Sequence, residues 1–125
     1  MSSIADNIGS VTRRIQKATL QAGREPGSVR LLAVSKTRPA EDLKAAFEAG
    51  QVAFGENYLQ EALDKMQALS DIEGIEWHFI GPIQSNKTRQ IAEAFAWVHS
   101  VDRLKIARRL SEQRPETLPP LNICL

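Results

Sequence analysis

The sequence lacks the features that would place a protein in a disulfide-bonded, secreted or membrane class. Its 125 residues include one cysteine, Cys124, which has no partner for an internal disulfide and fits a reducing compartment. The N-terminal segment is charged and amphipathic, without the continuous apolar stretch of a signal peptide or a membrane span. We therefore expect a cytoplasmic protein with no membrane partner.

An excess of charge is also missing. Sixteen basic and fifteen acidic residues leave a formal net charge of +1, so no electrostatic footprint favours nucleic acid or an anionic membrane surface. The composition, 42% apolar and 25% charged, is that of an ordinary globular domain rather than a disordered chain. Polyanion binding is therefore not expected, and the length suits one domain with its own hydrophobic core.

Signatures of nucleotide and metal sites are absent as well. Gly55 and Gly81 stand alone, without the glycine spacing of a dinucleotide or nucleoside-triphosphate loop. The two histidines, His78 and His99, are too far apart in sequence to form a local metal-ligand pair. We expect neither a nucleotide-binding loop nor a metal site.

What the sequence does contain is an alternation of short apolar runs and segments with helical periodicity. Apolar runs end near residues 35, 55, 80 and 100, each is followed by a helical pattern, and a fifth run covers 121–125. The run 31–35 predicts a strand buried on both faces, and the helix over 59–69 is expected to keep its charged side exposed. The repeated units predict an α/β fold with a parallel sheet.

Two architectures fit this pattern, an open doubly wound sheet and a (β/α)₈ TIM barrel. A barrel typically takes about 250 residues, so the length favours the open sheet for a complete protein. The chain nevertheless stops on the last apolar residue of its fifth predicted strand, Leu125, which predicts that it is a fragment.

Lys36 is the most chemically suggestive residue. It closes the apolar run 31–36, so that a primary amine stands at the carboxyl end of a predicted parallel strand, where ligands collect. A partly buried lysine has a lowered pKa, and an unprotonated amine can attack a carbonyl to form an imine. The alternative is a strand-end lysine that reaches into solvent. Polar residues such as Asn57 and His99 follow other strands, although each alone has an ordinary structural explanation.

Three motifs give these residues a family context. Residues 32–37 (LAVSKT), 54–58 (FGENY) and 77–81 (WHFIG, with QSNK at 84–87) resemble the pyridoxal phosphate homeostasis protein family of the YggS type. The resemblance covers essentially the whole chain. It implies the barrel fold of the alanine racemase N-terminal domain and binding of pyridoxal 5′-phosphate, which members are thought to buffer or deliver without catalytic turnover.

By position, the resemblance implies that Lys36 holds the cofactor as an internal aldimine, a Schiff base with the pyridoxal aldehyde. Asn57 and His78 are implied to lie near the pocket, and no catalytic residue is implied. Arg38 stands where many relatives have lysine, and it cannot serve as an alternative imine-forming amine. Two other functions stay open: a pyridoxal phosphate-dependent amino-acid racemase, and an aldolase-like barrel that uses Lys36 directly on a carbonyl substrate.

The resemblance further implies that residues 1–125 form one partial barrel domain, truncated at its C-terminal end and containing the first five strands. Barrels commonly bind phosphate in the loops after strands seven and eight, which belong to the missing part. We therefore expect weak or absent cofactor binding by the fragment, and self-association through the exposed edge of the fifth strand. The full-length form is expected to be a monomer.

Overall fold

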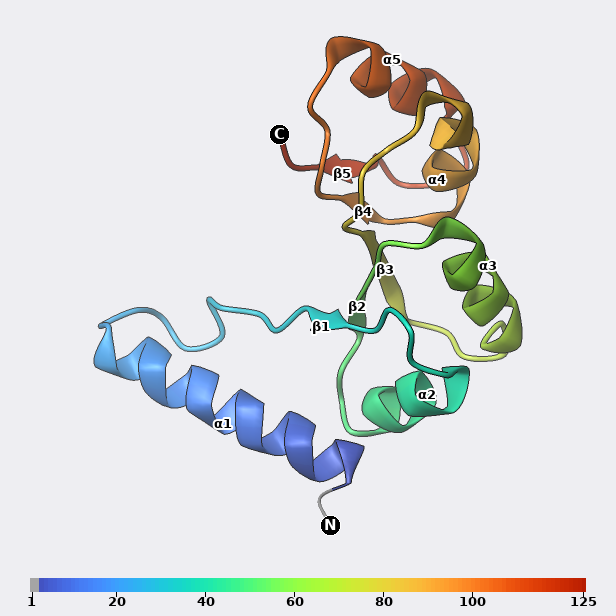
Figure 1. The fold of residues 1–125 in the computed structure, drawn as a ribbon. Coiled ribbons are helices and arrows are strands. Elements are labelled where there is room, and N and C mark those ends of the chain that lie inside the picture. The colour runs from blue at the N-terminus through green and yellow to red at the C-terminus, as the bar shows by residue number, and fades with distance from the viewer. Residues whose placement is uncertain (1–2) are drawn as a thin grey trace.

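The computed structural model describes residues 3–125, which fold into one parallel sheet flanked by helices (Figure 1). Along the chain the elements are α1 (Ile4–Gln21), β1 (Ala33–Val34), α2 (Ala40–Glu48), β2 (Ala53–Glu56), α3 (Leu59–Ala68), β3 (Glu76–Phe79), a 3₁₀ turn η1 (Ser85–Lys87), α4 (Thr88–Ala94), β4 (Trp97–Val98), α5 (Leu104–Gln113) and β5 (Asn122–Ile123). The predicted alternation of strands and helices is confirmed, although β1, β4 and β5 are only two residues long each.

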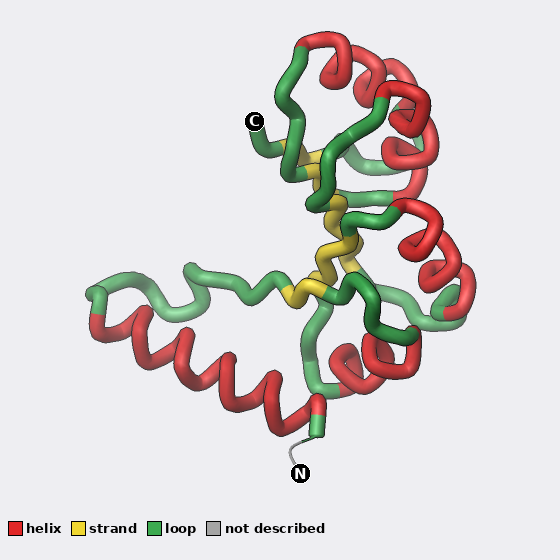
Figure 2. The backbone as a smooth tube through the Cα atoms, in the orientation of Figure 1, coloured by secondary structure: helices red, strands yellow, loops and turns green. Residues whose placement is uncertain are grey.

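The sheet follows chain order. Its strands pair as β1-β2-β3-β4-β5 and every pair is parallel, so all five strands end at the same edge of the sheet. Helices α2 to α5, each lying between two consecutive strands in the chain, gather along one side of the sheet (Figure 2). The predicted α/β fold with a parallel sheet is confirmed. A doubly wound sheet would instead reverse its strand order partway and carry helices on both faces.

Two hydrophobic clusters fill the space between the sheet and its helices. The first joins α3, α4 and α5 to β3 and β4, and its most deeply buried members include Ile91, Val98 and Ile106. The second packs α2 against β1 and β2 around Leu43 and Phe54. The core therefore lies on the side of the sheet that the helices cover.

Helix α1 contacts the second cluster through its first two turns. It begins with a capping box, in which the Ser3 hydroxyl accepts from the Asp6 N–H at 3.0 Å. Ile4 and Ile8 then join the second cluster beside α2. The rest of the helix extends away from the sheet, and Leu20 near its end is 63% exposed (Figure 1). Of the helices that residues 3–125 form, none is both long enough and apolar enough to cross a bilayer.

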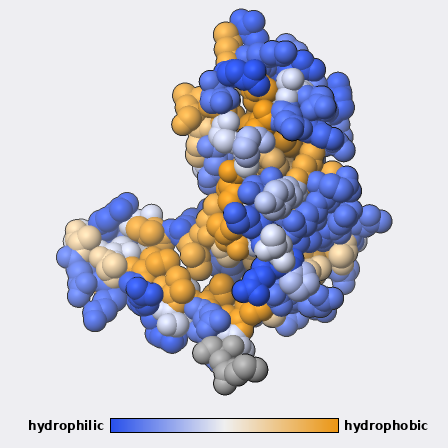
Figure 3. Space-filling model, in the orientation of Figure 1, coloured by the Kyte–Doolittle hydropathy of each residue, from blue (hydrophilic) through white to orange (hydrophobic). Residues whose placement is uncertain are grey.

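One prediction about the first strand is wrong. Val34 in β1 is 54% exposed, whereas the apolar run 31–35 predicts burial on both faces. The reason is that only one face of β1 meets the core, where Ala33 packs against the second cluster and Ser35 is buried. Val34 points to the other face, and β1 has a neighbouring strand on one flank only. In the space-filling view, apolar surface extends over the middle of the molecule, along the sheet and beside α1 (Figure 3).

Two leucines of α5 test where the core lies, because Leu110 is 2% exposed and Leu104 is 66% exposed. We expect Leu110→Ala to lower the free energy of unfolding by ~2–5 kcal/mol, through lost burial and the cavity left behind. The matched control Leu104→Ala should change it by less than about 0.5 kcal/mol. Urea denaturation followed by circular dichroism measures both, and equal losses for the two variants would contradict the assigned core.

Candidate functional site

The strand register aligns one row of residues on the side of the sheet opposite the helices. Val34 pairs with Gly55, Gly55 with His78, and His78 with Trp97. Because side chains alternate along a strand, paired residues share a side of the sheet, here the side away from the core. The carboxyl ends of the strands lie just beyond this row, where parallel α/β proteins bind their ligands. We call this side the open side.

Lys36 lies in the turn directly after β1, and its side chain is exposed rather than partly buried. The next residue, Thr37, has a φ of +65°. A β-branched residue rarely adopts this left-handed conformation, which costs roughly 1–3 kcal/mol and persists only where the surrounding structure holds it. The turn that carries the amine is therefore constrained, although the amine itself reaches solvent.

Asn57 directly follows β2, the strand next to the one that leads into Lys36. Its Oδ1 atom is buried and has no hydrogen-bond partner among residues 3–125. Gly81, which follows β3, packs against it so closely that a Cβ atom at Gly81 would lie 2.8 Å from both the Cβ and the carbonyl oxygen of Asn57. Only glycine fits this approach. The unpaired amide oxygen is an acceptor that a ligand with a hydrogen-bond donor can use.

His78 is only 6% exposed and belongs to a chain of hydrogen bonds on the open side. Its Nε2 lies 2.7 Å from Glu76 Oε1, and its Nδ1 lies 2.8 Å from His99 Nε2. A neutral His78 that donates from Nε2 to the carboxylate must accept at Nδ1, so His99 donates from Nε2. The Trp97 ring stacks on His78 with centroids 5.6 Å apart and an interplanar angle of 4°. Neighbouring residues thus fix both the orientation and the tautomer of His78.

The same surroundings set the protonation states of His78 and Glu76. Burial lowers the pKa of His78 below its ordinary value of 6.5, and the Glu76 carboxylate offsets this only in part. Burial also raises the pKa of Glu76, but the hydrogen bond from His78 and the charge of Arg30, whose Nη2 lies 3.2 Å from Glu76 Oε1, hold that pKa below 4.5. Near neutral pH, a neutral imidazole therefore stands beside a carboxylate.

A second polar cluster lies among residues that end β1 and β2 and residues of α3. Glu56 is fully buried and Lys65 is 6% exposed. Lys65 Nζ donates to the Ser35 carbonyl at 2.7 Å and to the two carboxylate oxygens of Glu56 at 3.0 and 2.9 Å, and it lies 2.8 Å from Glu61 Oε1. The Ser35 hydroxyl also donates to Glu56. We call Ser35, Glu56, Glu61 and Lys65 the buried ion cluster.

Glu61 connects this cluster to the turn after β1, because its Oε1 also accepts from the Thr37 N–H at 2.5 Å. The hydrogen bond from Lys65 is the main cause that lowers the pKa of Glu61; burial opposes it, and the Thr37 N–H adds to the lowering. Glu61 is therefore a carboxylate near neutral pH, and it holds the Thr37 amide as a charged acceptor.

The burial of Lys65 differs from the sequence-based expectation, which places the charged residues of the helix over 59–69 on its exposed side. A signal was nevertheless present. Lys65 stands three residues after Ala62 and four before Leu69, which are 0% and 6% exposed, so it lies in the apolar stripe of the helix. A lysine in such a stripe indicates a buried acidic partner.

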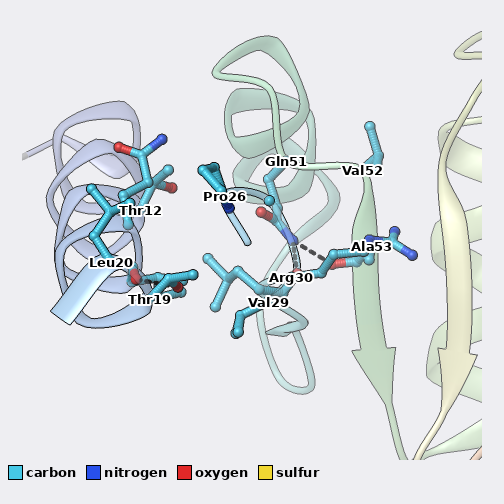
Figure 4. Close-up of a pocket in the computed structure, with 13 residues that line it drawn as sticks. Thr12, Thr19, Leu20, Pro26, Val29, Arg30, Gln51, Val52 and Ala53 are labelled. Carbon is cyan, nitrogen blue, oxygen red and sulfur yellow. Dashed lines mark hydrogen bonds between the residues drawn. The ribbon is translucent and has the colours of Figure 1, made fainter. Parts of the chain in front are cut away.

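A cavity of about 420 Å³ lies elsewhere, between α1 and the segment that leads into β1 (Figure 4). Its lining includes Leu20 from the helix and Gln51, whose Nε2 donates to the carbonyls of Leu31 and Ala53 at 2.7 and 2.8 Å. Leu31 and Gln51 precede β1 and β2, so the cavity lies at the amino ends of these strands, opposite the predicted site residues. The cavity is therefore separate from the candidate site.

No family model matches the sequence, but individual proteins match all of it. The chain is 66% identical over 125 residues to the pyridoxal phosphate homeostasis protein of Pseudomonas aeruginosa, and 51% identical over 127 residues to that of Escherichia coli. Each match covers 100% of this chain and 54% of the relative. The chain thus spans about half the length of the curated relatives it matches.

Solved structures are similar as well. PipY of Synechococcus elongatus with pyridoxal phosphate bound matches with a TM-score of 0.69 and 44% identity, covering 79% of this chain and 46% of PipY. PipY without the ligand matches with a TM-score of 0.75 and 42% identity, covering 89% and 51%.

The buried ion cluster predicts a large effect of removing its cation. Lys65→Met leaves the buried Glu56 carboxylate without its partner, and we expect a loss of roughly 3–5 kcal/mol in the free energy of unfolding. The control Lys44→Met, which removes an exposed lysine of α2, should change stability by less than about 0.5 kcal/mol. Adding Glu56→Gln to Lys65→Met should restore part of the loss in urea denaturation. A Lys65→Met variant as stable as its control would contradict the cluster.

His78 predicts how stability depends on pH. Its folded pKa lies below 6.5, so the unfolded chain binds more protons when the pH falls below that value. The stability linked to His78 is therefore complete above pH 6.5 and decreases as the solution is acidified. His78→Gln should flatten this dependence between about pH 7 and 5, as measured by urea denaturation at each pH. An unchanged slope in the variant would refute the assignment.

Proposed function

The chain belongs to the pyridoxal phosphate homeostasis protein family, and we propose that it binds pyridoxal 5′-phosphate through Lys36, as a non-catalytic binding protein of vitamin B6 homeostasis. The observation that carries the proposal is the exposed primary amine at the carboxyl end of a parallel strand, in a turn whose backbone is constrained. The names of the relatives, and the PipY structure with bound pyridoxal phosphate, support pyridoxal phosphate as the carbonyl compound that reacts with this amine.

The chemistry of the donor set fits this cofactor. Pyridoxal phosphate supplies an aldehyde, and its condensation with an unprotonated lysine amine forms a C=N bond and releases water. Lys36 offers the amine on a flexible stem from an exposed turn. Arg38 also carries a positive charge, 3.5 Å from Asp42, but its guanidinium does not take part in such condensation.

Asn57 and His78 complete the proposed site. The unpaired Asn57 Oδ1 would accept a hydrogen bond from a donor group of the ligand. His78 lies two strands away from β1, a distance of roughly 10 Å between strand axes, which an aromatic ring attached to Lys36 could bridge. Because Glu76, His99 and Trp97 fix the His78 ring, it would form a rigid wall rather than a mobile base.

We also propose that residues 1–125 are part of a (β/α)₈ barrel of the alanine racemase N-terminal type. Sequential strand order with helices gathered on one side supports this, since a barrel is wound in that way. The open side would then face the barrel interior. We assign the phosphate of the cofactor to the strands and loops that complete the barrel, and the aldehyde to Lys36.

The proposal is tested by reductive labelling. Because residues 1–125 alone are expected to bind the cofactor weakly, the chain is incubated with a large excess of pyridoxal phosphate. The C=N bond is then trapped by reduction with borohydride, and the modified peptides are quantified by mass spectrometry. We expect Lys36 to carry most of the label and Lys36→Arg, which keeps the charge but cannot condense, to lose it. The matched control Lys87→Arg, at an exposed lysine after β3, should leave the labelling of Lys36 unchanged.

Equal labelling of all exposed lysines, or preferential labelling of a lysine other than Lys36, would overturn the proposed function.

A further inference from the structure

The two backbone neighbours of Lys36 are both held by helix α3. On one side, the Ser35 carbonyl accepts from Lys65 Nζ at 2.7 Å, and Ser35 itself is 4% exposed. On the other side, the Thr37 N–H donates to Glu61 Oε1 at 2.5 Å. The residue between these two contacts is the one that carries the reactive amine. Its backbone is therefore fixed from a helix that lies across the sheet from the open side.

The two contacts are parts of one unit. Glu61 Oε1, which receives the Thr37 amide, also lies 2.8 Å from Lys65 Nζ, and Lys65 is in turn anchored by the buried Glu56 carboxylate. Glu61 and Lys65 are four residues apart on α3, the spacing at which helical side chains meet. The carboxylate that accepts from the Thr37 N–H is therefore itself fixed by a buried ion pair, unlike a free surface side chain.

Core packing alone does not explain the contact between Glu61 and Thr37. The Glu61 side chain is 30% exposed and Thr37 is exposed, so this bond adds little to the burial of the core. The hydrogen bond instead reaches Thr37, the residue whose backbone has the unfavourable φ of +65°. The carboxylate thus stabilises a turn conformation that threonine would otherwise leave.

We propose that Glu61 is a positioning residue for Lys36, and that Lys65 and Glu56 anchor it. This inference rests on the proposed function of Lys36. A lysine side chain has several rotatable bonds, so the backbone can direct its amine only by fixing the Cα–Cβ direction. A turn held at Ser35 and Thr37 fixes the Cα–Cβ direction of Lys36 and reduces the conformational freedom that is lost when its amine condenses with the aldehyde. Condensation at Lys36 is thereby favoured over condensation at other lysines.

Three variants of Glu61 separate the effect of its negative charge from the effect of the position of its accepting oxygen. Glu61→Gln keeps an oxygen at the same distance, so it can still accept from the Thr37 N–H, but it loses the charge. Glu61→Asp keeps the charge and withdraws the oxygen by one methylene. Glu61→Ala removes both. The control is Asp64→Ala, which removes an exposed carboxylate of the same helix whose partner is Gln60.

The readout is the ratio of borohydride-trapped pyridoxal phosphate at Lys36 to that at the exposed lysines Lys44 and Lys105, in the full 125-residue chain. We expect Glu61→Ala and Glu61→Asp, which both lose the oxygen that accepts from the Thr37 N–H, to lower this ratio up to about tenfold, the effect of one hydrogen bond. Glu61→Gln should stay within about twofold of the unaltered chain, and Asp64→Ala should not change the ratio.

A second readout follows the turn directly. Hydrogen exchange of the Thr37 amide should become faster in Glu61→Ala and Glu61→Asp and stay slow in Glu61→Gln. Circular dichroism confirms that each variant is folded, and Glu61→Asp, which keeps the charge beside Lys65, serves if Glu61→Ala does not fold.

The outcomes distinguish this inference from the function on which it rests. An unaltered chain that labels its exposed lysines equally refutes the proposed function, and the positioning role falls with it. A preference for Lys36 that persists in the folded Glu61→Ala and Glu61→Asp variants refutes the positioning role alone. A loss that Asp64→Ala shares refutes it as well, because the effect would then belong to any carboxylate of α3.

Discussion

The contact between Lys65 and Glu56 is the constraint on which the carboxyl end of the sheet depends. A fully buried carboxylate requires a compensating charge, and Lys65 supplies it from α3. The ammonium has three donors, and the structure gives it Glu56, the Ser35 carbonyl and Glu61 as acceptors. Because Ser35 follows β1 and Glu56 ends β2, one side chain connects a helix to two adjacent strands. The position of the turn that carries Lys36 follows from this connection.

The sheet separates two kinds of polar group. On the helix side, the buried ion cluster is satisfied internally and stabilises the strand ends. On the open side, a hydrogen-bonded chain fixes the His78 ring. At the carboxyl ends of the strands, the Asn57 Oδ1 has no hydrogen-bond partner among residues 3–125, and Lys36 is exposed. Polar groups that already have hydrogen-bond partners stabilise the fold, whereas polar groups without a partner can bind a ligand. In our account the helix side therefore directs the turn, and the open side meets the ligand.

Much of the fold could be predicted from periodicity, because short apolar runs and helical stripes alternate regularly, and the parallel sheet followed from that alternation. The position of Lys36 at a strand end was predictable for the same reason. Local patterns could not show that Val34 faces the side of the sheet that no helix covers, since both faces of an apolar strand look alike in sequence. Nor could they show that His78 meets His99, which depends on the register of β3 with β4. Lys65 occupies the apolar stripe of α3, but a charged side chain on a helix is typical of its exposed face, so the charge pattern predicts exposure where the spacing predicts burial.

We propose that α3 holds the turn from which Lys36 binds the aldehyde of pyridoxal phosphate. A crystal structure of the borohydride-reduced complex tests it most directly. Our account predicts continuous density from Lys36 Nζ to the cofactor on the open side of the sheet, with Thr37 still at positive φ and its N–H still donating to Glu61. A cofactor attached to another lysine, or a turn that has left Glu61 while the cofactor is bound to Lys36, would contradict it.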